Sequence, residues 1–224
     1  VVAVFCYLLV QIINYQRAQE YRESLTDGIS YVISEGVARQ PEKQQKLDWI
    51  SDASDLLELP IYYVDAARVE LSRTERKRIA EQKSVVRYDA NNGIGYVIIG
   101  LKDDPKHFLY IKVDKIGERQ MKALPIFVLD YLIFYPGQER EYLEKIKKHF
   151  YYPIEIADIR DINLDSEQIG RLRQGQSVLL YKDSASIRGT TISIVSPMPN
   201  HPAQVLVLGP VPMFNWMPFQ LAAG

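Results

Sequence analysis

The chain repeats part of itself after 93 positions, and this repeat limits the folds it can adopt more than any other feature. No gap is needed in the alignment. The identical pairs are Pro60 and Pro153, Ile61 and Ile154, Asp65 and Asp158, Leu71 and Leu164, Arg78 and Arg171, Ser84 and Ser177, Val85 and Val178, and Tyr88 and Tyr181. A repeat of this kind predicts two copies of one supersecondary unit.

Helix-start signals agree between the two copies. Ser72-x-x-Glu75 has the pattern of a capping box, in which the Ser oxygen accepts a backbone N–H and the Glu side chain reaches back. Asp165-x-x-Gln168, 93 positions later, has related groups in both roles. The spacing therefore predicts that a short capped helix begins at the same place in each copy.

The hydrophobic periodicity assigns the same element order to both copies. We expect a helix (42–58 and 139–149), a strand (59–65 and 153–158), the capped helix (73–82 and 166–173) and three further strands (84–88, 96–101 and 108–113; 177–181, 190–195 and 205–208). The predicted fold class is α+β, with two tandem units, 42–123 and 139–212, each an antiparallel sheet covered by a helix, and a connector at 124–138. Two such units resemble the PAS-like sensor modules of bacterial receptors.

The opening residues 1–13 carry no charge and only one polar residue, Gln11. A full membrane crossing takes about 20 apolar residues, so this run fits the outer part of a first transmembrane helix. A cleaved signal peptide is the alternative, but no small-residue cleavage site follows, and the residues before Cys6 are not those of a lipoprotein. Residues 213–224 are predicted to form the exit segment and the start of a second transmembrane helix.

Residues 14–41 are predicted to form one helix outside the membrane, closed by Pro41. Its apolar side chains recur at steps of three and four, at Leu25, Ile29, Val32, Ile33 and Val37. We expect this stripe to pack against the same stripe of a second copy in a homodimer. The alternative is an ordinary core helix, because a stripe alone does not identify its partner.

Charge and composition exclude several classes of function. The formal net charge is −1, whereas nucleic-acid binders normally carry a basic surplus, so we expect no nucleic-acid partner. Arg17 and Arg22 after the apolar run are mixed with Glu20 and Glu23, which is typical of a flank outside the cytoplasm. No nucleophile elbow, phosphate loop or metal spacing is present, so we expect no catalytic residues and no cofactor in this region.

Two charged clusters are candidate ligand sites. Asp158 and Asp161 are weak candidates for a divalent cation, with helix capping by Asp165 and solvation as the alternative. The basic run Arg73, Arg76, Lys77 and Arg78 could bind an anion or could be a solvated helix face. The three histidines, His107, His149 and His201, make no metal spacing, and nothing selects one of them as a pH sensor.

The last fifty residues carry a more specific pattern. It consists of Arg171-Leu172-Arg173-x-Gly175-x-x-Val178, then Val205–Leu208, Gly209-Pro210-Val211-Pro212 and Phe214-x-Trp216. This pattern resembles the periplasmic domain of RstB- and BfmS-type sensor histidine kinases. The resemblance implies a homodimer in the inner membrane, with this region in the periplasm, that controls a cytoplasmic response regulator by phosphorylation through kinase domains that this sequence does not contain.

Gly209, Pro210, Val211 and Pro212 are the residues expected to couple the last strand to the second membrane helix. The two prolines fix φ and remove N–H donors, which predicts a stiff link; a plain exit turn is the alternative. The stimulus is expected to be a periplasmic ligand or an accessory protein of unknown identity. The rival function is a membrane-anchored periplasmic binding or assembly protein, or a chemoreceptor sensor domain, without a kinase.

Overall fold

The computed structural model describes residues 2–89, 91–114, 117–184 and 189–212. These residues form six α-helices, two short 3-10 helices and eight strands. The first half holds α1 (Val2–Ala38), α2 (Lys43–Leu57), β1 (Ile61–Asp65), η1 (Ala66–Arg68), α3 (Arg73–Ala80), β2 (Val85–Asp89), β3 (Ile94–Gly100) and β4 (His107–Val113). The second half holds α4 (Glu118–Ile133), α5 (Glu139–Lys147), β5 (Ile154–Asp158), η2 (Ile159–Asp161), α6 (Ser166–Arg173), β6 (Val178–Ser184), β7 (Gly189–Met198) and β8 (His201–Pro212).

The two halves have the same sheet topology. One antiparallel sheet has the strand order β1-β4-β3-β2 and the other has the order β5-β8-β7-β6. The strands β1 and β5, the 3-10 helices η1 and η2, and the helices α3 and α6 begin and end 93 residues apart. Both predicted capping boxes are present, at Ser72 with Glu75 and at Asp165 with Gln168. The α+β class and the predicted helix starts are therefore confirmed.

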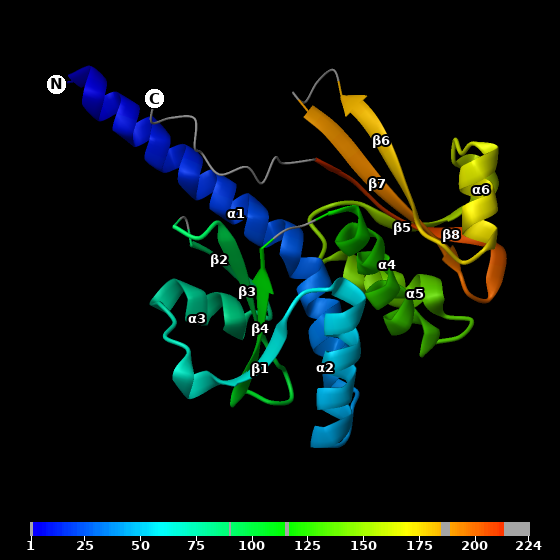
Figure 1. Ribbon diagram of the computed structural model, residues 1–224, viewed down its shortest axis with the longest axis horizontal. Coiled ribbons are helices and arrows are strands. Elements are labelled where there is room, and N and C mark those ends of the chain that lie inside the picture. Colours follow the sequence, from blue (N-terminus) through cyan, green and yellow to red (C-terminus); the bar gives the residue numbers. More distant parts are fainter. Residues whose placement is uncertain (1, 90, 115–116, 185–188, 213–224) are drawn as a thin grey trace.

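Each sheet has one face against the long helices and the other against a short helix (Figure 1). A large shared core contains side chains of α1, α2, α4 and α5 and of the inner faces of both sheets. A small outer core lies under α3, built from Leu71, Val85, Ile98 and Phe108. Its counterpart under α6 is built from Leu172, Val178, Val195 and Val205. Strand alternation explains the division, because successive side chains point to opposite faces of a sheet.

Helix α4 was not predicted: the range 124–138, expected to be a connector, contains most of it. Its buried side chains include Phe127, Val128 and Leu132, and it packs against α1 on one side and against the second sheet on the other. Pro125 lies inside the helix, where proline normally removes a backbone hydrogen bond. Burial of the apolar face outweighs that cost here.

The stripe on α1 faces the interior of its own chain. Ile29, Val32, Ile33 and Val37 are buried in the shared core, and Leu25 packs against it. These side chains are therefore not available as a dimer surface. In the structure α1 is a core helix, which was the alternative interpretation of the stripe. The prediction assigned the stripe to a second copy because it lacked α4, which is the helix that covers it.

Two glycines let other side chains approach α1 closely. A Cβ atom on Gly28 would lie 2.5 Å from the Phe150 ring, and one on Gly36 would lie 2.4 Å from Cζ2 of Trp49. Close packing of these rings on the helix backbone fixes the position of α1 against α2 and the segment after α5.

Residues 2–38 form one continuous helix, so the predicted ranges 1–13 and 14–41 are not separate elements. Figure 1 shows the N-terminal half of α1 projecting beyond the sheets. Among the described residues, no helix meets the length and hydropathy needed to span a bilayer. The predicted exit segment, with Phe214 and Trp216, lies outside the described residues.

Candidate functional site

A cluster of polar side chains fastens α1 to the first sheet, and we call it the α1 joint: Gln19, Glu23, Thr26, Asp27, Arg78 and Ser84. Nη2 of Arg78 donates to both carboxylate oxygens of Asp27, at 3.0 and 3.1 Å. Its Nε lies 3.0 Å from Oε2 of Glu23 and 2.8 Å from the carbonyl oxygen of Ser84. One guanidinium on α3 therefore holds two carboxylates that lie one turn apart on α1.

Ser84 completes the α1 joint. Its backbone N–H and its hydroxyl both donate to Oδ1 of Asp27, at 2.9 and 2.8 Å, and its hydroxyl lies 2.6 Å from that of Thr26. Gln19 donates both to Glu23 and to the carbonyl oxygen of Val86 on the edge strand β2. Arg78, taken in the sequence as part of a solvated or anion-binding run, is thus mostly buried and internally paired.

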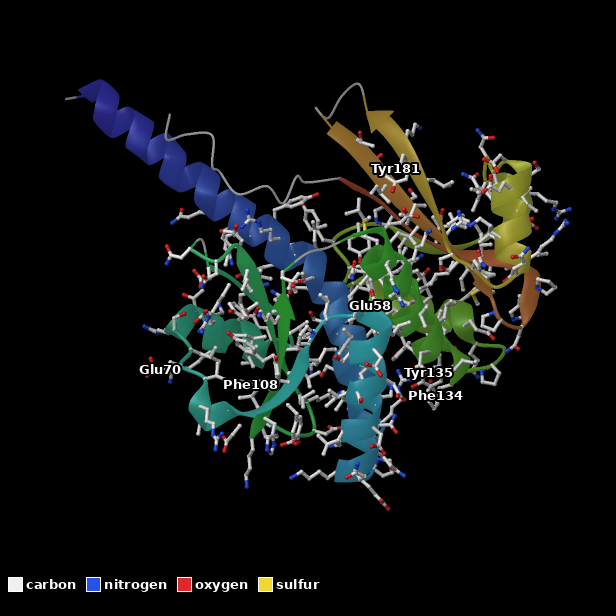
Figure 2. All side chains as sticks on the ribbon, in the orientation of Figure 1. Glu58, Glu70, Phe108, Phe134, Tyr135 and Tyr181 are labelled. Atoms are coloured by element: carbon white, nitrogen blue, oxygen red, sulfur yellow. The ribbon has the colours of Figure 1, made fainter. Side chains whose placement is uncertain are left out.

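An open groove lies on the outer face of the first sheet, beside α3. Its volume is about 760 Å³. The residues that line it come from η1, the loop before α3, α3 and β4: Ala66, Val69, Glu70, Leu71, Ser72, Arg76 and Phe108. In Figure 2, Glu70 lies on the loop before α3 and Phe108 on β4. The groove joins an apolar floor to two charged groups, which is the composition of a small-molecule site.

Backbone contacts hold the walls of the groove in place. Nε of Arg76 donates to the carbonyl oxygen of Leu71 at 2.9 Å, and Nη2 of Arg87 donates to that of Glu70 at 2.5 Å. Arg87 also donates to both carboxylate oxygens of Glu75, at 2.7 and 3.0 Å. This charge-assisted pairing lowers the pKa of Glu75 to about 2, so its carboxylate remains ionised and keeps both Arg87 and the start of α3 in position.

Gly209, Pro210, Val211 and Pro212 lie inside β8 rather than after it. Ile192 pairs with Val211 and Ile194 pairs with Leu208, so two residues of β8 stand opposite Ser193 alone. This is a β-bulge, and Gly209 adopts the left-handed φ of +110° that it requires. The Gly209–Pro210 peptide is cis. The extra residue returns Val211 to the inner face, where it packs against the shared core.

The acidic candidates Asp158 and Asp161 do not form a metal site. The Asp158 carboxylate accepts hydrogen bonds from the backbone and side chain of Arg160, at 2.9 and 2.8 Å, and this pairing lowers its pKa to about 2. Asp165 caps α6, as its alternative reading predicted. Within the ranges that the structure describes, no three His, Cys, Asp or Glu side chains are grouped as metal ligands would be.

The histidines lie at three separate places. His107 is 2.9 Å from Oδ1 of Asp104 and stacks on Tyr63, with ring centroids 4.3 Å apart. His149 stacks on Tyr31 of α1, with centroids 3.6 Å apart, and burial lowers its pKa. His201 is 3.5 Å from Glu139. They share no site.

Sequence reasoning missed the groove and the α1 joint. The joint was signalled by Glu23 and Asp27, two acidic residues four apart and therefore on the same side of the helix that carries the apolar stripe. The groove was signalled by differences between the repeats, because Ala66 and Arg76 stand where the second copy has Ile159 and Ile169.

Comparison with known proteins assigns no family. No family model matches the chain, and no protein of curated function is similar to it in sequence.

Proposed function

We propose that the chain is the extracytoplasmic sensing region of a membrane receptor, a homodimeric sensor histidine kinase of the RstB/BfmS type. In this proposal the two sheet units are PAS-like modules in tandem. The region itself binds the signal, and the response regulator is phosphorylated by domains that lie elsewhere in the receptor. The supporting features are the two units with equal strand order and the single long helix that both of them contact.

The observation that carries the proposal is the attachment of α1. This helix is uninterrupted from its apolar N-terminal residues to Ala38, and its C-terminal half is fixed to the first sheet by the α1 joint and to α4 by the shared core. A rigid helix transmits a shift or rotation along its length with little loss. A change at the sheets therefore reaches the N-terminal end of α1, which we place at the bilayer.

The second connection to the membrane is β8. Figure 1 shows this strand running toward the side of the molecule from which α1 projects. Its last residues pair with β7 up to Pro212, so the strand stays part of the sheet until that residue. Two rigid elements, α1 and β8, thus leave the body in a common direction, as a receptor with both ends in one membrane requires.

The test uses the full-length protein in native membranes. Arg78→Gln removes the cation of the α1 joint, and Arg73→Gln removes an exposed cation from the same helix as the matched control. We expect Arg78→Gln to change autophosphorylation at least several-fold while Arg73→Gln leaves it unchanged. Thermal unfolding of both variants shows that the body stays folded at the assay temperature.

Topology is checked in the same membranes. Glu58→Cys places a thiol at an exposed loop position, and an impermeant maleimide should label it in intact spheroplasts. Labelling from outside together with no phosphoryl transfer in any variant would favour the membrane-anchored binding protein instead. Labelling only after lysis would contradict both functions.

A further inference from the structure

The residues that line the outer groove of the first unit have counterparts in the second unit, and the two sets of residues differ. Residues 93 positions apart occupy equivalent places in η1, the following loop and the short helix. On the sheet, Val64 pairs with Phe108 while its equivalent Ala157 pairs with Val205, so Phe108 corresponds to Val205. Each lining residue can therefore be compared with its partner in the other unit.

The second unit has isoleucine at three of the equivalent positions and an uncharged side chain at a fourth. Ala66 corresponds to Ile159 and Val69 to Ile162, and both isoleucines pack against the outer core under α6. Arg76 corresponds to Ile169 and Glu70 to Asn163. The first unit thus has smaller side chains at Ala66 and Val69, although Phe108 is larger than Val205, and it has one cation and one anion that the second unit does not have at these positions.

Among the described residues, neither charge takes part in an ion pair within the fold. Nε of Arg76 binds a carbonyl oxygen, but in the part of the chain that the structure describes no ion pair joins Arg76 to a carboxylate or Glu70 to a cation. Both exposed side chains line the groove together with Ala66, Val69, Leu71 and Phe108. Unpaired opposite charges at separate points on an apolar floor complement a molecule with an anionic end, a cationic end and an apolar body.

We propose that this groove binds a short apolar peptide with free ends, its carboxylate on Arg76, its ammonium on Glu70 and its side chains on the apolar floor. A groove of about 760 Å³ is larger than one amino acid fills, and it lies within the range of sites for ligands the size of a small peptide. This inference rests on the proposed sensing function, because it names the signal. Arg76 and Arg78 lie on the same short helix, so occupancy of the groove bears directly on the α1 joint.

The test is calorimetric titration of the full-length protein in lipid nanodiscs with leucyl-phenylalanine. N-acetylated and C-amidated forms of the peptide remove one charge each, and we expect each to bind about tenfold more weakly, as loss of about 1.4 kcal/mol implies. In Glu70→Gln the acetylated and free forms should bind equally, and in Arg76→Gln the amidated and free forms should do so. Free leucine should bind more weakly than the dipeptide because it covers less of the apolar floor.

Two variants complete the design. Ala66→Ile combined with Arg76→Ile copies the lining of the second unit and should abolish binding, whereas Arg73→Gln on the exposed part of α3 should leave it unchanged. Absence of binding at millimolar peptide, or equal binding of the free, acetylated and amidated forms, overturns the proposal. Binding without any change in phosphorylation would leave the ligand assignment standing and count against the receptor function, and signalling without binding would do the reverse.

Discussion

Gln82 and Gly175 occupy equivalent positions 93 residues apart, and both have a left-handed backbone, with φ of 59° and 80°. Each lies just after the C-cap of a short helix, α3 or α6. The N–H of Lys83 donates to the carbonyl oxygen of Arg78 at 2.9 Å, and that of Gln176 donates to Arg171 at 3.0 Å, which gives both helices the Schellman ending. The two halves share this turn although only one of them has glycine at it.

Replacing Gln82 by Gly should therefore stabilise the protein. A non-glycine residue in the left-handed region costs about 1 kcal/mol or more, and the added chain entropy of glycine offsets part of the gain. We expect a net increase of about 0.5 kcal/mol in the free energy of unfolding, measured by urea denaturation. The reciprocal change Gly175→Gln should lower the free energy of unfolding by a similar amount, about 0.5 kcal/mol, and a gain there would contradict the argument.

Asp27→Ala should destabilise the fold strongly. The change leaves the Arg78 guanidinium and the Ser84 N–H without their main acceptor in a mostly buried place. Breaking such a pair by removing one partner costs about 3 kcal/mol. Asp52→Ala, on the exposed face of α2, is the control and should change the unfolding free energy by less than about 0.5 kcal/mol. Equal effects of the two changes would mean that the α1 joint contributes nothing specific.

Gly36→Ala tests the packing of α1. Because the new Cβ would lie 2.4 Å from Trp49, the ring must move out of the shared core, and overpacking of this kind costs about 1–3 kcal/mol. The same substitution at Gly170 in α6 meets no atom within 4 Å and should stabilise by up to about 1 kcal/mol through helix propensity. Differential scanning calorimetry should place the two melting temperatures on opposite sides of the wild type.

Acid should weaken the first unit through Glu75. Its pKa falls from 4.5 to about 2 in the folded state, chiefly because Arg87 donates to it. A depressed carboxyl pKa adds stability above pH 4.5, and this stability is lost as pH falls toward 2. Glu75→Gln keeps the capping-box acceptor but not the charge. Between about pH 5 and 2 the wild type should lose about 1 kcal/mol more than the variant, after solvent screening is allowed for. Parallel pH profiles would contradict the assignment.

Gly209→Ala should disrupt the bulge in β8. The residue has φ of +110°, and a Cβ there would lie 2.6 Å from the carbonyl oxygen of Ile192. Backbone atoms cannot yield as a flexible side chain can, so we expect a loss of about 3 kcal/mol. Gly137→Ala also has positive φ but open space around it, and it should cost only about 1 kcal/mol. The difference between the unfolding midpoints of the two variants measures the cost of the steric clash at position 209, because both variants place alanine at a positive φ.

Much of the fold could be predicted because its signals are local. The capping boxes at Ser72 and Asp165 and the alternating strands each depend on residues of their own segment, and the repeat gave each of these signals twice. Strand ends were predicted less accurately, because β8 was predicted at 205–208 and extends over His201–Pro212. Backbone pairing across the bulge carries the strand through two prolines, which local propensity cannot show.

The errors concern long-range packing. Pro125 lies inside α4, and proline disfavours a helix prediction, so this helix was not predicted. Without α4, the stripe that contains Ile29 and Val37 had no predicted packing partner within the chain. Arg78 was assigned to solvent because its partners Glu23 and Asp27 lie more than 50 residues away in sequence. Sites formed by side chains from distant segments leave few local signals in the sequence. Positions at which the two copies of a repeat have different residues are one such signal.

The interior shared by α1 and α4 has an evolutionary consequence. A module that buries its own core can be deleted, exchanged or expressed by itself, but here either half would expose the apolar helix face that the other half covers. Both copies should therefore be retained together, and the differences between them should be best tolerated outside this shared interior.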